Sequence, residues 1–211
     1  MEKTPAGPAA PRPAARPMRA DARRNYERLL AEARDSFAKH GADVFLDDIA
    51  RRAGVGVATL YRHFPTREAL LDAVAQDWTE AVLTEARELV AGPDPAAALA
   101  LWLRSLVSHM SVYRGLVAAL VPSMGNENSP LNPSCQVMAE AGALLLEHGQ
   151  RAGVIRGDAT TAEVLQLVSG VAWVCEQSGG SADVDRLLSF TMDSLRCEAV
   201  AAARQAAGRR G

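Results

Sequence analysis

The stretch from Leu46 to Leu71 constrains the fold of this chain more than any other part of it. Apolar residues recur three or four positions apart over 46–53, so they line one face of a helix about two turns long. Gly54 can adopt the left-handed backbone that ends a helix, and the spacing predicts a second short helix over 57–64. Two helices joined by so tight a turn form a helix-turn-helix.

The second helix of this pair has one face suited to a protein core and one suited to a polar partner. Leu60 and Phe64 are four residues apart, so both can pack inward. Tyr61, Arg62 and His63 supply hydrogen-bond donors and aromatic surface for the other side. A short helix with such an exposed side fits the major groove of double-stranded DNA.

The segment GVGVATLYRHFPTREALL, Gly54 to Leu71, resembles the DNA-binding signature of the TetR family of bacterial transcriptional regulators. The resemblance covers roughly residues 22–71 at motif level, whereas the rest of the chain is similar only in length and helical character. The alternative interpretation is an amphipathic core helix with incidental polar residues. Turn glycines, a recognition helix and a following helix cap occur together in order, which favours the DNA-binding interpretation.

The resemblance implies an all-α fold with an N-terminal three-helix DNA-binding domain and a larger helical domain for ligand binding and dimerisation. It also implies a homodimer that binds a palindromic operator and is released by a small, mostly apolar effector. The alternatives are a regulator controlled by a partner protein, or one without any effector. Activation in place of repression also stays open.

Chemistry assigns different roles to the predicted DNA contacts. Arg62 suits a guanine edge because a guanidinium can bond O6 and N7 together, and Val57 and Ala58 can touch thymine methyl groups. The other contacts are expected on phosphates, with Tyr61 also able to reach a base edge. The full set of candidate DNA-binding residues is Arg23, Arg51, Val57, Ala58, Thr59, Tyr61, Arg62, His63 and Arg67.

One departure from the family pattern lies just before the first helix of the motif. Phe45 stands where relatives usually carry a Ser or Thr that caps the helix and meets a phosphate. A missing cap costs about 1 kcal/mol in a typical helix. The usual phosphate contact from this position is therefore not expected here.

Four regions are predicted along the chain. Residues 1–18 are proline-rich and are expected to form a disordered arm, and residues 206–211 a disordered tail. The DNA-binding domain is expected over 19–65, with a basic junction that suits DNA for its first residues, and the larger helical domain over 66–205. Residues 1–15 are better explained as a solubilising tail.

About nine helices are expected, and no strand. The first spans 20–40, and a connecting helix runs from Thr66 to Val90, about 37 Å at 1.5 Å per residue. The segment 96–121 is expected to split near Gly115. The remaining helices are predicted over 134–150, 160–177 and 183 to about 203.

The larger domain offers two sets of candidate residues. The apolar residues of its last two helices resemble a dimerisation pair, although core packing would use the same side chains. They are Val164, Leu167, Val168, Val171, Leu187, Leu188, Met192 and Leu195. Polar or aromatic residues within apolar helical runs are candidates for a ligand pocket, and each could instead be a core residue. These are Trp102, His109, Met110, Tyr113, Met124, Met138, His148, Trp173, Cys175 and Gln177.

Charge distribution, cysteine spacing and the absence of known motifs argue against several other functional classes of protein. Residues 1–65 hold 12 Lys and Arg against 8 Asp and Glu, so only the N-terminal part is basic, as expected when one end approaches phosphates. The three cysteines form no C-x-x-C pair, which favours buried thiols over a metal site or a redox switch. No catalytic or cofactor-binding motif is present, and no apolar run could span a membrane. We therefore expect a cytoplasmic regulator without cofactor, and no enzyme.

Overall fold

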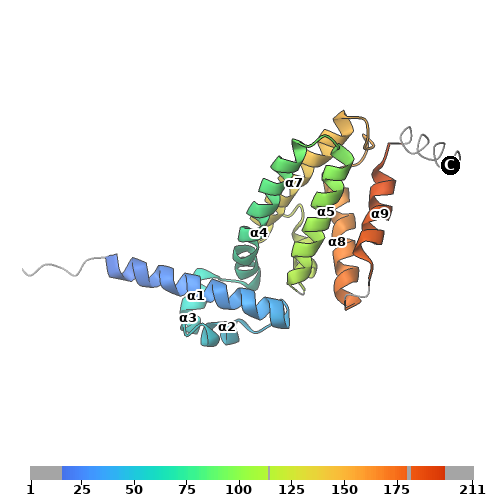
Figure 1. The fold of residues 1–211 in the computed structure, drawn as a ribbon. Helices are drawn as coiled ribbons and strands as arrows, with labels where there is room; N and C mark the ends of the chain where they lie inside the picture. The colour runs from blue at the N-terminus through green and yellow to red at the C-terminus, as the bar shows by residue number, and fades with distance from the viewer. Residues whose placement is uncertain (1–15, 114, 180–181, 198–211) are drawn as a thin grey trace, which may run out of the picture.

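The computed structural model describes residues 16–113, 115–179 and 182–197, and over these residues the fold is all-α. Figure 1 shows α1 to α3 gathered into a small lobe, from which α4 leads into a larger bundle containing α5, α7, α8 and α9. The helices are α1 (Arg16–His40), α2 (Leu46–Arg52), α3 (Val57–His63), α4 (Arg67–Val90), α5 (Pro95–Val112), α6 (Leu116–Leu120), α7 (Asn132–Arg151), α8 (Thr161–Gln177) and α9 (Val184–Leu195), with a short 3₁₀ helix at Val121–Ser123.

The small lobe is held together by an apolar core between α1 and the helix-turn-helix. Leu29 and Phe37 of α1, Ile49 of α2 and Leu60 of α3 have no exposed surface. Side chains of this size each gain roughly 1.5–3 kcal/mol on full burial. Their burial fixes α3 against α1 and leaves its opposite side free.

The connecting helix α4 begins and continues as its sequence predicts. The hydroxyl of Thr66 accepts a hydrogen bond from the backbone N–H of Ala69 at 3.2 Å, which caps the helix. The helix packs on α1 at its start and then on α5 and α7 in the larger lobe. The indole N–H of Trp102 in α5 donates to the carbonyl oxygen of Val82 at 3.1 Å. The helix therefore joins the two lobes as one continuous rod.

The break predicted near Gly115 is present between α5 and α6. Asp94 caps the start of α5 by accepting from the N–H groups of Ala96 and Ala97, both at 3.0 Å. The helix ends at Val112, and Gly115 takes a φ of +82°, a left-handed conformation that favours glycine. The short helix α6 follows immediately and packs against α5 and α8.

Both ends of the helical region differ from the sequence prediction. The first helix already begins at Arg16, so residues 16–18 are helical and do not belong to a disordered arm. The last helix ends at Leu195, because the chain then pairs with 154–156: the Arg156 N–H donates to Leu195 O at 2.8 Å. Residues 1–15 and the predicted tail at 206–211 lie outside the described residues. Among the helices described, none is long and apolar enough to cross a membrane.

Candidate functional site

The recognition helix α3 presents the two faces that its sequence predicts. Leu60 and Phe64 are buried, with 0% and 3% of their surface exposed. Val57 and Tyr61, on the other side, remain 39% and 44% exposed although both are large and apolar or aromatic. This confirms the predicted orientation and leaves an outward face of about two turns for a partner.

The side chains of α3 that are predicted to contact DNA differ in how exposed they are. Ala58 and Arg62 are exposed, whereas Thr59 and His63 are half-buried. The ring of His63 meets the ring of Tyr26 edge-on, with centroids 5.7 Å apart. The side chain of Arg62 is therefore open to solvent, whereas the ring of His63 packs against α1.

The hydroxyl of Tyr61 donates to Oδ1 of Asp47 in α2 at 3.3 Å. This bond spans the two helices of the motif and orients the exposed phenol ring. Because a carboxylate beside DNA repels phosphate, Asp47 also works against a phosphate contact at this place. The position of Tyr61 therefore suits a base edge better than a phosphate.

The turn between α2 and α3 favours glycine at Gly54 because of its left-handed backbone, and the side chain of Arg28 lies close to it. The φ of Gly54 is +63°, and a Cβ atom there would come within 2.4 Å of Nη2 of Arg28. The guanidinium of Arg28 thus lies over the turn, a placement that the sequence analysis missed. No local pattern could have found it, because the two residues are 26 positions apart and meet only through folding.

Arg23 and Arg51 are exposed, and each pairs with an acidic neighbour on its own helix. Arg23 Nε lies 2.9 Å from Glu27 Oε1, and Arg51 bonds Asp48. Exposed pairs of this kind contribute only about 0–1 kcal/mol, so a phosphate can compete for either guanidinium. The predicted absence of a cap on α2 is confirmed, since Phe45 makes no side-chain cap bond and is 75% exposed.

Arg67 is already engaged within the protein. Its Nη1 donates to the carbonyl oxygen of Val44 at 2.7 Å and also bonds the carbonyl oxygen of Ala42. Both carbonyls belong to the loop between α1 and α2, and the Arg67 side chain is half-buried. These bonds favour a structural role that closes the loop, in place of the phosphate contact predicted from the sequence.

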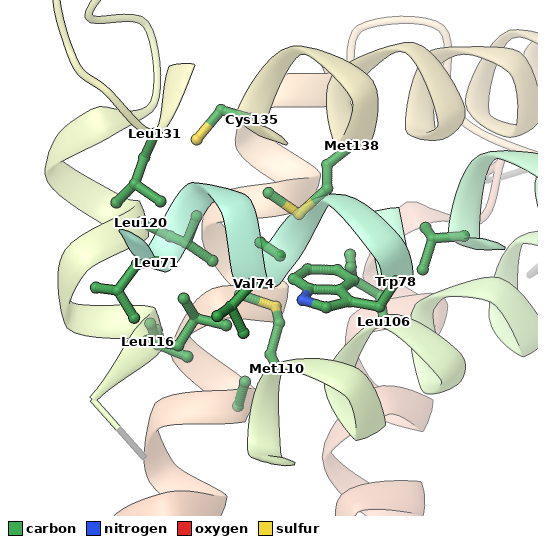
Figure 2. Packing of buried hydrophobic residues seen from close by; sticks show 14 of the residues in the cluster. Leu71, Val74, Trp78, Leu106, Met110, Leu116, Leu120, Leu131, Cys135 and Met138 are labelled. Atoms are coloured by element: carbon green, nitrogen blue, oxygen red, sulfur yellow. The ribbon is translucent and has the colours of Figure 1, made fainter. Parts of the chain in front are cut away.

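In the larger lobe, three of the predicted pocket residues are part of the core. Trp102 has no exposed surface, and Met110 and Met138 are each 1% exposed. Figure 2 shows Met110, Met138 and Trp78 pointing into the same interior between α5, α7 and α4. The polar and aromatic character that suggested a ligand contact here serves internal packing.

The remaining pocket candidates do not gather around one cavity. His109 stacks on Trp78 with ring centroids 5.8 Å apart, and its Nδ1 lies 2.8 Å from the carbonyl oxygen of Ser105. Tyr113, Met124 and His148 are half-buried and Cys175 is buried, whereas Trp173 and Gln177 are exposed. The predicted set therefore divides between core and surface.

Open grooves lie around α8. One of about 360 Å³ runs between α6 and α8 and includes Trp173, and another of about 480 Å³ lies between the starts of α7 and α8 beside Met124 and Cys135. A third, of about 650 Å³, lies between α8 and α9 and carries charged residues such as Arg156 and Glu163. All three volumes fall within the range of small-molecule sites, and the smallest lies near the lower end of that range.

Asp72 is a buried group that the sequence analysis did not single out. It is 7% exposed, and its Oδ1 accepts from the hydroxyl of Ser134 at 2.7 Å and from the Ser134 N–H at 3.2 Å. Gln76 donates to Oδ2 at 3.0 Å. Asp72 therefore caps the first turn of α7 from α4, which ties the connecting helix to the larger lobe.

Two of the three thiols, those of Cys135 and Cys175, are poorly suited to redox chemistry. Burial, with the nearby Asp72 charge, raises the pKa of the Cys135 thiol to about 11, and burial also raises the pKa of Cys175. Thiolate is the reactive form, so both are inert near neutral pH. In the part of the chain that the structure describes, no three His, Cys, Asp or Glu residues come together as a metal site.

Comparison with known proteins agrees with this geometry. Residues 29–74 match the family described as bacterial regulatory proteins, tetR family, and residues 94–197 match the transcriptional regulator SbtR-like, C-terminal domain. The transcriptional repressor KstR2 of Rhodococcus jostii is 31% identical over 187 residues, which cover 79% of this chain and 89% of that protein. The regulatory protein RaaS of Mycobacterium tuberculosis is 28% identical over 131 residues, or 62% of this chain and 59% of RaaS.

Among solved structures, RolR in complex with resorcinol is 25% identical, with a TM-score of 0.61 over 87% of this chain and 93% of RolR. The match therefore extends across both lobes, and the helix-turn-helix lies within residues 29–74, the part of the chain that matches the tetR family. The identity to KstR2 over most of both chains, together with the match over 29–74, decides the assignment. This chain belongs to the TetR family of bacterial transcriptional regulators.

Proposed function

We propose that the protein is a dimeric repressor that binds a palindromic operator and is released by a small, mostly apolar molecule. The observation that carries the DNA-binding half of this proposal is the exposed face of α3, with Arg62 outward and Leu60 buried. Its similarity to the repressor KstR2 favours repression.

Base reading is assigned to the residues of α3 that remain exposed. Arg62 suits a guanine through a paired bond to O6 and N7, and Val57 and Ala58 suit thymine methyl groups. Arg23, Arg51 and Thr59 supply phosphate contacts, which set register and carry no sequence preference. A single helix of this length reads few base pairs, so specific binding requires a second copy.

The dimer face is assigned to apolar residues on α8 and α9 that the chain does not bury by itself. Leu167 and Val174 on α8 are 52% and 43% exposed, and Phe190 on α9 is 57% exposed. Five of the eight residues suggested by sequence, namely Val164, Val168, Leu188, Met192 and Leu195, are instead buried within one chain. Leu167 and Val174 are seven residues apart and so share one face of the helix.

The dimer assignment can be tested by placing a charge in this face. The double variant Leu167→Glu with Phe190→Glu is expected to be monomeric in light scattering and to bind operator DNA weakly. Leu101→Glu, on α5 and 55% exposed, is the matched control and should remain dimeric. A double variant that stays dimeric and well folded would show that the interface lies elsewhere.

Release by a small molecule is supported by the grooves around α8 and by RolR, a relative solved with bound resorcinol. Moving a dimer from mostly DNA-competent to mostly incompetent requires roughly 3–5 kcal/mol of differential binding. Burying about 200 Å² of apolar ligand surface supplies roughly 5 kcal/mol in total. A small effector must therefore bind one arrangement of the dimer almost exclusively.

A second candidate is a regulator controlled by a partner protein, which is favoured because the pocket candidates Trp102, Met110 and Met138 are core residues with at most 1% of their surface exposed. A thermal-shift screen of metabolites, followed by operator release assays on each hit, separates the two. Hits that stabilise the protein and lower its operator affinity support the small-molecule proposal. Hits that leave operator affinity unchanged would favour control by a partner protein.

A further inference from the structure

The groove between α6 and α8 combines apolar walls with one buried polar group. Val117 and Val121 form part of one wall, and Ser169 and Trp173 on α8 form part of the other. None of the residues lining this groove of about 360 Å³ carries an ionisable side chain. Transfer of a charged molecule into such a site would be unfavourable, so the groove selects neutral molecules.

Ser169 is the polar group in this groove that points to a ligand. It is 1% exposed, and its hydroxyl has no hydrogen-bond partner among the described residues. A buried hydroxyl without a partner is unfavourable, and a bound molecule with its own hydroxyl or carbonyl would satisfy it. Trp173, which is 49% exposed, offers a flat indole face for a ring beside it.

The same face of α8 carries a contact that fixes the start of α6. Ser169, Trp173 and Glu176 are spaced four and then three residues apart, so they lie along one stripe of the helix. Oε1 of Glu176 accepts a hydrogen bond from the backbone N–H of Gly115 at 2.8 Å. Since α6 has no side-chain cap of its own, this carboxylate from α8 caps it.

Gly115 also touches the DNA-binding domain. A Cβ atom at Gly115 would lie 3.2 Å from Cβ of Ala42, which is 5% exposed in the loop between α1 and α2. The carbonyl oxygens of this loop are bonded by Arg67 at the start of α4. The start of α6 therefore abuts the loop that positions the helix-turn-helix.

We propose that the α6–α8 groove is an effector site for a neutral, hydroxyl-bearing aromatic molecule, and that the Glu176–Gly115 bond transmits its occupancy to Ala42. A ring inserted between the two helices moves α6 relative to α8, which displaces Gly115 against the DNA-binding domain. This inference rests on the proposed function, because it names the effector class and the transmission route of that regulator.

Binding is tested by calorimetry with 2-naphthol, benzyl alcohol and benzoate, each titrated into the full-length protein. At least one of the two neutral probes should bind, and benzoate should bind at least about tenfold more weakly because of its charge. Ser169→Ala and Trp173→Ala should each weaken the neutral probe about fivefold or more, with melting temperatures measured to confirm folding. Three results would overturn this effector site: neutral-probe binding that neither variant weakens, benzoate that binds as tightly as the neutral probes, or neutral probes that do not bind up to their solubility limit.

Transmission is tested by the ratio of operator Kd with and without the neutral probe. The wild-type ratio is expected to be about fivefold or more and to fall to about one in Glu176→Ala. Glu176→Gln should keep the ratio because its amide oxygen can still accept from Gly115. Glu147→Ala, an exposed carboxylate deletion on α7, is the matched control and should also keep it.

Two further outcomes separate this inference from the proposed function. If Glu176→Ala fails to fold, Glu176→Asp withdraws the acceptor with a smaller change and should lower the ratio as well. If a folded Glu176 variant that lacks the bond to Gly115 still shows the wild-type ratio of operator Kd values, the proposed transmission route is wrong. A ratio of one in the wild-type protein would also overturn this route. In either case operator binding itself would stand, whereas a wild-type protein that selects no operator would overturn the proposed function.

Discussion

The bonds of Arg67 lead to a prediction that separates a structural arginine from a DNA-contacting one. Arg67→Ala removes two hydrogen bonds from a cation to the carbonyl oxygens of Ala42 and Val44. Both carbonyls belong to the loop between α1 and α2, where Ala42 is buried and Val44 is half-buried. The variant should therefore loosen the loop that holds α2 and α3 in place.

The expected size of the effect follows from these two bonds. Hydrogen bonds to charged groups contribute about 1.5–3 kcal/mol each, and the half-buried position of Arg67 favours the lower end. A loss of about 3 kcal/mol lowers Tm by roughly 6–12 °C in a protein of this size. If Arg67 instead met a phosphate in each half-site, the slope of log K against log salt would fall by about 1.8 for a dimer.

Thermal melts and operator binding at several salt concentrations distinguish the two roles. We expect Arg67→Ala to melt well below wild type and, at a temperature where it is folded, to keep the wild-type salt slope. Arg62→Ala is the stability control, because Arg62 is exposed and its loss should leave Tm nearly unchanged. An Arg67→Ala protein with wild-type Tm and a reduced salt slope would refute the structural role.

Three further predictions follow from individual residues. Arg62→Ala should cost about 1–3 kcal/mol of operator affinity and relax preference at one position in each half-site, whereas a uniform loss across sequences would remove its base-reading role. Hydrogen bonds from Thr160 lower the pKa of Glu163 below its ordinary 4.5, so the stability that Glu163 adds is present above pH 4.5 and is lost as the pH falls through the lowered pKa. The Tm of Glu163→Gln should therefore lie below that of wild type at neutral pH, and this difference should shrink in acid. A Tm difference that stays constant with pH would contradict the lowered pKa of Glu163. With a pKa of about 11, the Cys135 thiol should react slowly with iodoacetamide in the folded protein, and rapid labelling would contradict its burial.

Local features of this fold could be predicted from the sequence because their causes are local. The spacing of Leu60 and Phe64 places their side chains on the inward face of α3, and both are buried. The caps at Thr66 and Asp94 depend on side chains and N–H groups within three residues of each other. The break at Gly115 follows from the freedom of glycine to adopt positive φ.

Contacts between distant residues could not be predicted in this way. Arg67 reaches carbonyls 23 and 25 positions earlier, and Glu176 accepts from the N–H of Gly115, the residue just before α6, which lies 61 positions earlier. The end of α9 at Leu195 depends on pairing with 154–156, which helix propensity does not reveal. Each of these is decided by which helices pack together.

The candidate pocket was the least predictable part of the site. Trp102, Met110 and Met138 lie among apolar residues at helical spacing, a pattern shared by core residues and by ligand contacts. Their burial shows that these three residues pack in the core of the larger lobe. Trp173 has the same kind of sequence surroundings, yet it is half-exposed beside a groove, because it lies on the side of α8 that is not packed into the core.

Selection of bound sequences from a random DNA pool tests the central claim most directly. A dimer that reads DNA through the exposed face of α3 should enrich a palindrome whose half-site centres lie about one helical turn, roughly 34–36 Å, apart or slightly more. Enrichment of a single unrepeated site, or no enrichment at all by a folded dimer, would contradict the account of this protein as a palindrome-binding regulator.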